Sequence, residues 1–255
     1  MDDKQGFTLV ELAIVLVIIG LIVGGVLVGQ DMIKAAEVRG TVGQVEKYNA
    51  AVNTFRTKYA GLPGDLLSTK AANYGMVART GTDGHGDGDG LLEVCGSSSP
   101  NAGCEVLLFW RDLSFANMVD GNFTTATDDF ANGGNPIATN EVPLFFPAAK
   151  LGRGNYFTVL SDTGANYYEL IGIVSTDDAG AYTLSANLTP NEALNIDIKM
   201  DDGAPGRGSV QAVDATDLNT LASDGGACRV NINTYETSTA IKAVTPACGL
   251  RFHFN

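Results

Sequence analysis

The chain has 255 residues, enough for one sizeable domain, and carries 29 Asp and Glu against 16 Lys and Arg, a formal net charge of -13. This acidic balance argues against non-specific binding to nucleic acid, which depends on basic side chains that neutralise phosphates. The mean hydropathy of +0.08 is high for so acidic a protein. A strongly apolar segment must therefore offset the remainder of the chain.

The charge divides the chain into two unlike parts. Residues 1–60 contain six basic and six acidic side chains, so residues 61–255 carry the whole net charge. Within the first part, residues 7–29 form an apolar run in which Glu11 is the single charged residue. At about 1.5 Å per helical residue the run spans about 34 Å, which is enough to cross a bilayer. We predict a membrane-inserted helix.

Two simpler interpretations of this run are weaker. A secretory signal peptide needs a basic leader, a short apolar core and a small-residue cleavage site. Here Lys4 is the single basic residue before the apolar run, and the run is long. A plain transmembrane anchor is the stronger alternative. Glu11 argues against it, because an unpaired carboxylate in hydrocarbon costs several kcal/mol. A helix that packs among copies of itself could offer Glu11 a cationic partner.

The apolar run follows a short polar leader and opens with Gly6-Phe7-Thr8-Leu9-Val10-Glu11. In this context the motif resembles the processing signal of type IV pilins and type II secretion pseudopilins. The resemblance implies that a prepilin peptidase removes residues 1–6 by cutting between Gly6 and Phe7, and that the new amine of Phe7 is methylated. It also implies that Glu11 pairs with the N-terminal amine of an adjacent subunit.

The resemblance further implies a structural subunit, not an enzyme, that assembles into a type IV pilus-like filament or, as an alternative, a type II secretion pseudopilus. Such a subunit starts as a single-pass protein of the bacterial inner membrane with its C-terminal domain in the periplasm. The expected partners are copies of itself, other pilin-like subunits, the prepilin peptidase, the inner-membrane assembly platform and the membrane; no nucleic acid is expected. A further alternative is a membrane-anchored periplasmic binding protein that keeps Met1.

The helical pattern continues beyond the membrane run. Apolar residues recur at three-, four- and seven-residue spacings until Gly61 and Pro63, which end a helix. We predict one helix from residue 7 to about residue 59, whose amphipathic second half, residues 30–60, packs on a globular domain at residues 61–255. The predicted packing residues are Ile33, Val38, Val42, Val45, Val52, Phe55 and Tyr59.

The globular part is rich in Gly, Asn, Asp and Thr, with short apolar runs bounded by turn residues. Strands are predicted at residues 156–160, 167–174, 182–188 and 250–254. A helix is predicted around residues 105–118, with Leu107, Trp110, Leu113 and Met118 on one face. The predicted fold class is α+β, with a long N-terminal α-helix packed on a small antiparallel β-sheet domain, as in pilins.

The four cysteines allow three disulfide pairings, and their spacing contains no CxxC pair of the kind found in zinc sites. Export from the cytoplasm, which the resemblance implies, favours disulfides. We expect Cys95 to pair with Cys104 and Cys228 with Cys248. The second pair resembles the C-terminal disulfide loop of pilins. Free, buried thiols are the alternative.

An acidic, glycine-rich loop at residues 81–93 is a candidate calcium site. It contains four carboxylates, Asp83, Asp87, Asp89 and Glu93, and calcium takes several oxygen ligands at about 2.3–2.6 Å. The loop partly resembles an EF-hand loop, although Glu93 falls one position too early for it. No cofactor is required; a structural Ca²⁺ is the hypothesis, and a solvated loop without metal is the alternative.

Three further segments, residues 55–66, 105–121 and 197–205, resemble a pattern of larger bacterial pilin-like proteins. In the last of them, Asp202-Gly203 is interpreted as a turn in preference to a metal site. The sequence has no GxSxG, HExxH or phosphate-binding motif, and its only histidines are His85 and His253. These features give no support for an enzyme.

Overall fold

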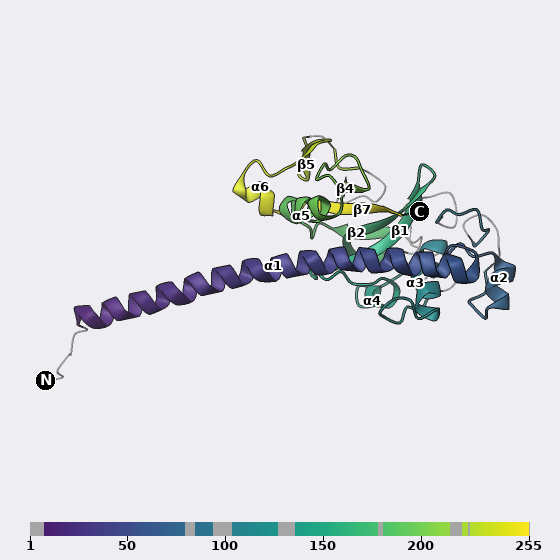
Figure 1. Ribbon diagram of the computed structural model, residues 1–255, viewed down its shortest axis with the longest axis horizontal. Helices are drawn as coiled ribbons and strands as arrows, with labels where there is room; N and C mark the ends of the chain where they lie inside the picture. The colour runs from purple at the N-terminus through teal and green to yellow at the C-terminus, as the bar shows by residue number, and fades with distance from the viewer. Residues whose placement is uncertain are drawn as a thin grey trace.

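The computed structural model describes residues 8–79, 85–93, 104–126, 136–177, 181–214, 221–223 and 225–254. One long helix, α1 (Leu9–Tyr59), projects far beyond a globular domain that surrounds its C-terminal half (Figure 1). Thr8 caps the helix in a capping box with Glu11, and Ala60 ends it in the left-handed conformation. The prediction of a single continuous helix is confirmed.

The domain is built on an antiparallel sheet with strand order β1-β2-β7-β4, and β3 pairs with β2 beyond the end of β7. A two-stranded sheet lies apart from it. These strands are β1 (Asn155–Asp162), β2 (Ala165–Thr176), β3 (Tyr182–Ser185), β4 (Val210–Asp214), β5 (Arg229–Asn231), β6 (Thr234–Tyr235) and β7 (Cys248–Phe254). The other helices are α2 (Ser68–Asn73), α3 (Cys104–Phe115), α4 (Val142–Phe145), α5 (Pro190–Met200) and α6 (Ala240–Val244). The α+β class is confirmed.

The second half of α1 supplies part of the core. Its buried residues follow the helical repeat and are Val38, Thr41, Val45, Tyr48, Ala51, Val52, Phe55 and Tyr59. Most of the predicted contacts are therefore correct, but Ile33 is 60 % exposed. The prediction for Ile33 was wrong because the domain begins to cover the helix only near Val38.

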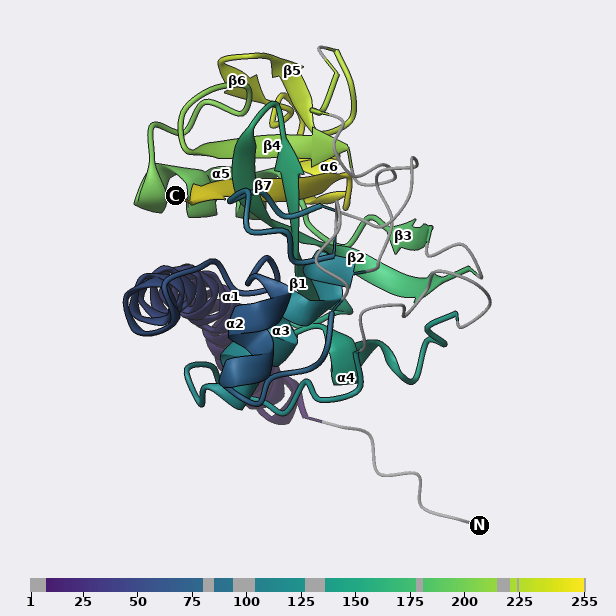
Figure 2. The same cartoon turned by 90° about the vertical axis from the view of Figure 1, so that its right-hand side faces the viewer.

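The predicted helix at residues 105–118 is α3, which packs beside α1 and against β1 (Figure 2). Five consecutive residues, Val106 to Trp110, are buried, so the prediction of one apolar face was too narrow. The first two turns of α3 are therefore enclosed on all sides, whereas Phe115 at the end of the helix is exposed. The helix ends at Phe115, and Met118 packs on the core from the following turn.

The four predicted strands correspond to β1, β2, β3 and β7, whereas β4 and α5 were not predicted. The start of α5 has a recognisable signature: Thr189 and Glu192 form a capping box, and Pro190 occupies the first turn. Strand β4 has only five residues, and it becomes a strand by pairing with β7. Local sequence carries little information about such a pairing.

Candidate functional site

The projecting half of α1 is the most unusual surface of the molecule. Every residue from Leu9 to Val28 is exposed, and large apolar side chains such as Leu21 are exposed by 73 %. By length and composition α1 is a helix that could cross a membrane, and none of its most apolar stretch is buried in the domain. A patch of this size is not stable in water. Lipid or other protein must cover it.

Glu11 lies in the first turn of this exposed helix. Its Oε2 accepts hydrogen bonds from the Thr8 backbone N–H (2.8 Å) and the Thr8 hydroxyl (2.9 Å), and its own N–H donates to Thr8 Oγ1 (3.3 Å). Gly6 and Phe7 lie outside the described residues, so the cleavage point stays a prediction. Among the described residues both side-chain bonds use Oε2, so Oε1 can accept a further donor.

The acidic loop is held at the C-terminal end of α1, where Ala60, Asp65, Gly88 and Gly90 surround one hollow. Asp65 accepts hydrogen bonds from the backbone N–H groups of Gly88 (2.6 Å) and Gly90 (2.8 Å). In the same way Glu105 accepts from Gly86 (2.6 Å) and Glu93 (2.8 Å). Two buried carboxylates from α3 and the segment after α1 therefore fix the loop, and neither was predicted.

These carboxylates are electrostatically strained. Burial, together with the smaller repulsion from Asp89 and Asp87, raises the pKa of Asp65 to about 6. Burial likewise raises the pKa of Glu105 to about 8, with added repulsion from Asp65 and Asp87. Asp65, Asp87 and Glu105 can bring one oxygen each within 4.8 Å of one another. Near neutral pH such a group retains a proton or attracts a cation.

Three of the four predicted calcium ligands come together. Asp87, Asp89 and Glu93 each offer an oxygen within 4.8 Å of the others, whereas Asp83 lies outside the described residues. Part of their hydrogen-bonding capacity is used locally, because Asp87 accepts from Asp89 N–H (3.0 Å) and Asp89 from Leu91 N–H (2.7 Å). Calcium binding stays a prediction.

The segments at residues 55–66 and 105–121 meet in the core. Asp112 of α3 forms a buried ion pair with Arg79 (2.8 Å) and accepts a hydrogen bond from Gly64 N–H (2.8 Å). Gly64 has a φ of +85°, and a Cβ there would lie 2.4 Å from the Glu105 carbonyl oxygen. Only glycine fits this position. Gly64 and Asp112, one from each segment, therefore have a structural role: they allow α3 to pack closely on the chain that follows α1.

The segment at residues 197–205 lies elsewhere, at the end of α5. Asp197 is buried and accepts from Tyr235 OH (2.9 Å) and Gly203 N–H (3.0 Å), while Asp202 accepts from Ala204 N–H (2.8 Å). Gly203 has a φ of +75°. The chain turns here as the sequence predicted, and the two carboxylates stabilise the turn by accepting hydrogen bonds from its backbone N–H groups.

A disulfide joins Cys228 to Cys248 and closes a loop that contains β5, β6 and α6. Cys104 is also disulfide-bonded, and its expected partner Cys95 lies outside the described residues. None of the three described cysteines is a free thiol. The alternative of free thiols is therefore wrong for these three.

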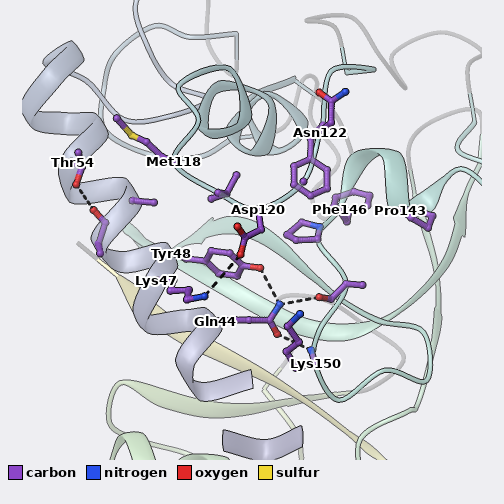
Figure 3. Close-up of a pocket in the computed structure, with 17 residues that line it drawn as sticks. Gln44, Lys47, Tyr48, Thr54, Met118, Asp120, Asn122, Pro143, Phe146 and Lys150 are labelled. Atoms are coloured by element: carbon purple, nitrogen blue, oxygen red, sulfur yellow. Dashed lines mark hydrogen bonds and ion pairs between the residues drawn. The ribbon is translucent and has the colours of Figure 1, made fainter. Parts of the chain in front are cut away.

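A hollow of about 670 Å³ lies between α1 and the segments at residues 118–123 and 143–150 (Figure 3). Gln44 connects its two walls, donating to the Ala148 carbonyl (3.0 Å) and accepting from Lys150 N–H (2.7 Å). Lys47 and Asp120 form a loose, exposed pair across the opening (3.9 Å). The lining residues that the structure describes include no histidine or cysteine.

Comparison with known proteins identifies the N-terminal segment. Residues 1–27 match the family model of the prokaryotic N-terminal methylation motif. The chain therefore carries the prepilin-type signal of type IV pilins and pseudopilins, as the sequence predicted. No curated protein and no solved structure matches the chain. The motif and the exposed helix together support a pilin-like or pseudopilin subunit.

Proposed function

We propose that the chain is a structural subunit that assembles through α1 into a type IV pilus-like filament. The observation that carries this proposal is the apolar surface of residues 9–28, which bears the methylation motif and continues without a break into the half of α1 packed on the domain. Because the helix is continuous, the packing of α1 helices in the filament core would fix where each subunit's globular domain lies on the filament surface.

The membrane stage precedes the filament in this proposal. The prepilin peptidase cleaves the inner-membrane form between Gly6 and Phe7, and the domain faces the periplasm while the assembly platform adds the subunit to a growing filament. Lipid already covers the apolar helix at that stage, so moving it among other helices gains little hydrophobic free energy. Close packing and polar pairing must then drive assembly.

Glu11 provides the polar pairing. The amine created at Phe7 and the Glu11 carboxylate are each costly to bury alone, and an ion pair between neighbouring subunits recovers much of both costs. The exposed Glu11 side chain remains bound to Thr8 of its own turn through Oε2. Its Oε1 faces the partner amine. The pair would set the axial offset between neighbouring subunits.

Two alternatives share the membrane helix. A type II secretion pseudopilin would assemble by the same contacts into a shorter periplasmic filament. A membrane-anchored binding protein would use α1 as a tether only and would remain monomeric. The hollow of Figure 3 is large enough for a small ligand, but its open, mixed lining favours no particular one.

Deletion of the gene, with complementation by the wild-type gene, tests the proposal. Sheared surface filaments are imaged and probed for the chain, and exoprotein release is assayed in parallel. A pilus subunit is found in the sheared filaments, and a pseudopilin is required for exoprotein release. If the chain stays in the membrane fraction as a monomer and neither phenotype changes, the filament proposal is wrong and the anchored protein is favoured.

A further inference from the structure

Helix α6 exposes two large apolar side chains. Ile241 is 77 % exposed and Val244 58 % exposed, and their three-residue spacing places them on one side of the helix, while Ala243 is buried. The Cys228–Cys248 disulfide encloses this helix in its loop. The loop thus holds two large apolar side chains in a fixed outward position.

The position of α6 along the molecule is informative. It lies at the end of the domain from which the exposed half of α1 emerges (Figure 1). Val244 lines a hollow of about 460 Å³ together with Asp31, Lys34 and Ala35 of α1. Helix α6 therefore lies at the same level along the molecule as the residues that directly follow the apolar run, across a hollow from them (Figure 1).

This level corresponds to the surface of a bilayer. If residues 7–29 span the hydrocarbon, Asp31 and Lys34 lie about 3–8 Å beyond Gly29, at 1.5 Å per residue. Each headgroup layer is about 5–7 Å thick. The neighbouring α1 residues Met32 and Ile33 are also more than half exposed, so α1 itself still exposes apolar side chains at the level of the headgroups.

The charges around this hollow suit anionic lipid. Basic Lys34, Arg153 and Lys199 line it with acidic Asp31 and Glu192, and Glu192 is paired with Arg153 (2.7 Å). The hollow is thus slightly basic in a chain of net charge -13.

Two further charged groups lie at the α6 end of the domain. Lys242 of α6 is exposed and is paired with Glu236 (3.2 Å). The acidic loop lies at the opposite end of the packed half of α1, beside Ala60. Basic residues near a membrane surface are attracted to anionic headgroups.

We infer that α6 rests in the headgroup layer of the membrane while the subunit is anchored, with Ile241 and Val244 inserted among anionic lipids. This inference depends on the membrane stage of the proposed function. The contact limits the tilt of the domain on its helix and must be released when the subunit is extracted into a filament.

The test uses the full-length chain in nanodiscs of anionic phospholipid brominated on acyl carbons near the headgroup, which quench tryptophan. The reporter is Ile241→Trp, and the control at the far end of the domain is Tyr74→Trp, directly after α2, at a residue that is 45 % exposed. Leu21→Trp reports insertion of α1 itself. The native Trp110 is fully buried and provides a constant background.

We expect the fluorescence added by Ile241→Trp to fall about twofold in brominated nanodiscs, as for a side chain at the headgroup boundary, and to recover partly when the lipid is zwitterionic. The Tyr74→Trp signal should not change.

If Leu21→Trp is quenched while Ile241→Trp behaves like Tyr74→Trp, the inference about α6 is wrong, but insertion of α1 in the membrane is supported. A blue shift of the Ile241→Trp emission that depends on protein concentration, without quenching, would assign the surface to a second copy instead. Absence of quenching at Leu21→Trp would contradict the membrane stage itself.

Discussion

At the scale of single residues, Glu11 is the one charge of the apolar run and occupies a position with two uses. In the isolated chain it completes the capping box with Thr8. In the proposed filament it also pairs with the Phe7 amine of a neighbour. The cap is worth about 1 kcal/mol, whereas an unpaired ion in an apolar helix bundle costs several kcal/mol. The pairing should therefore dominate the effect of substitution.

We predict that Glu11→Ala is processed normally and fails to assemble. The expected result is wild-type cleavage, seen by N-terminal mass, with a strong reduction of the chain in sheared filaments. Glu46→Ala is the matched control, because Glu46 is an exposed carboxylate on the domain half of the same helix. Normal incorporation of the Glu11 variant would remove the proposed role of this residue in setting register.

Glu105 shows the limit of sequence analysis at this scale. The glycine-rich loop was recognised, but the two carboxylates that hold it, Asp65 and Glu105, are separated from it in sequence. Only the packing of α3 on the segment after α1 brings them together. The signal available in the sequence was their position in two segments that resemble larger pilin-like proteins, and that resemblance specified no contact.

The raised pKa of Glu105, about 8 against an ordinary value of 4.5, predicts a pH-dependent stability. The folded state holds this proton more tightly than the unfolded state, so stability falls as the pH rises from about 4.5 to about 8. The slope is at most about 1.4 kcal/mol per pH unit. Between pH 6 and pH 8 Glu105 dominates, since Asp65 and Asp197 have pKa values of about 6.

Glu105→Gln should flatten this dependence. Chemical unfolding of the detergent-solubilised chain at pH 6, 7 and 8 provides the measurement. The variant loses one of two acceptor oxygens, so we expect it to be less stable by about 1–3 kcal/mol at pH 6. The slope, not this offset, is the readout. Parallel curves for the wild type and the variant would show that the carboxyl is already ionised at pH 6.

At the scale of elements, the long helix was predicted almost completely, because apolar periodicity and the Gly61 and Pro63 stop signals are local. The sheet was predicted in part. Strand β4 depends on its pairing with β7, which no local pattern contains. Helix α3 was located, and the predicted Leu107, Trp110 and Leu113 are buried, but its buried surface is wider than one face because every residue from Cys104 to Trp110 is enclosed.

The acidic loop is the element for which a ligand can be tested directly. If Ca²⁺ binds Asp87, Asp89 and Glu93, a free concentration of about 100 times the dissociation constant adds about 2.7 kcal/mol to the stability of the folded state. We expect the melting temperature to rise with calcium and to fall with chelator. Asp87→Asn should abolish the shift, and Asp202→Asn in the other acidic turn should retain it. No shift at millimolar calcium would mean a loop without metal.

At the scale of the whole molecule, α1 joins two parts of different composition, an apolar N-terminal half of the helix and an acidic globular domain. The charge-balanced first 60 residues include the surface that must be covered by lipid or by other helices, and the acidic domain carries the entire net charge. The domain packs on α1 from Val38 onward. Folding of the domain and insertion of the helix should therefore be separable.

Truncation tests this separation. We predict that a chain lacking residues 1–30 is a soluble, folded monomer, because it retains every buried residue of α1. A chain lacking residues 1–45 should be destabilised by several kcal/mol, since Val38, Thr41 and Val45 leave the core. Circular dichroism melting and size-exclusion chromatography compare the two. Aggregation or unfolding of the shorter deletion would show that the apolar half of α1 contributes to the fold.

The N-terminal mass of the chain, taken from filaments sheared off the cell surface, tests the proposed filament subunit most directly. The proposal predicts a chain that begins at a methylated Phe7, without residues 1–6, and that is enriched in the filament fraction. A chain that retains Met1 and is recovered only from membranes would contradict it.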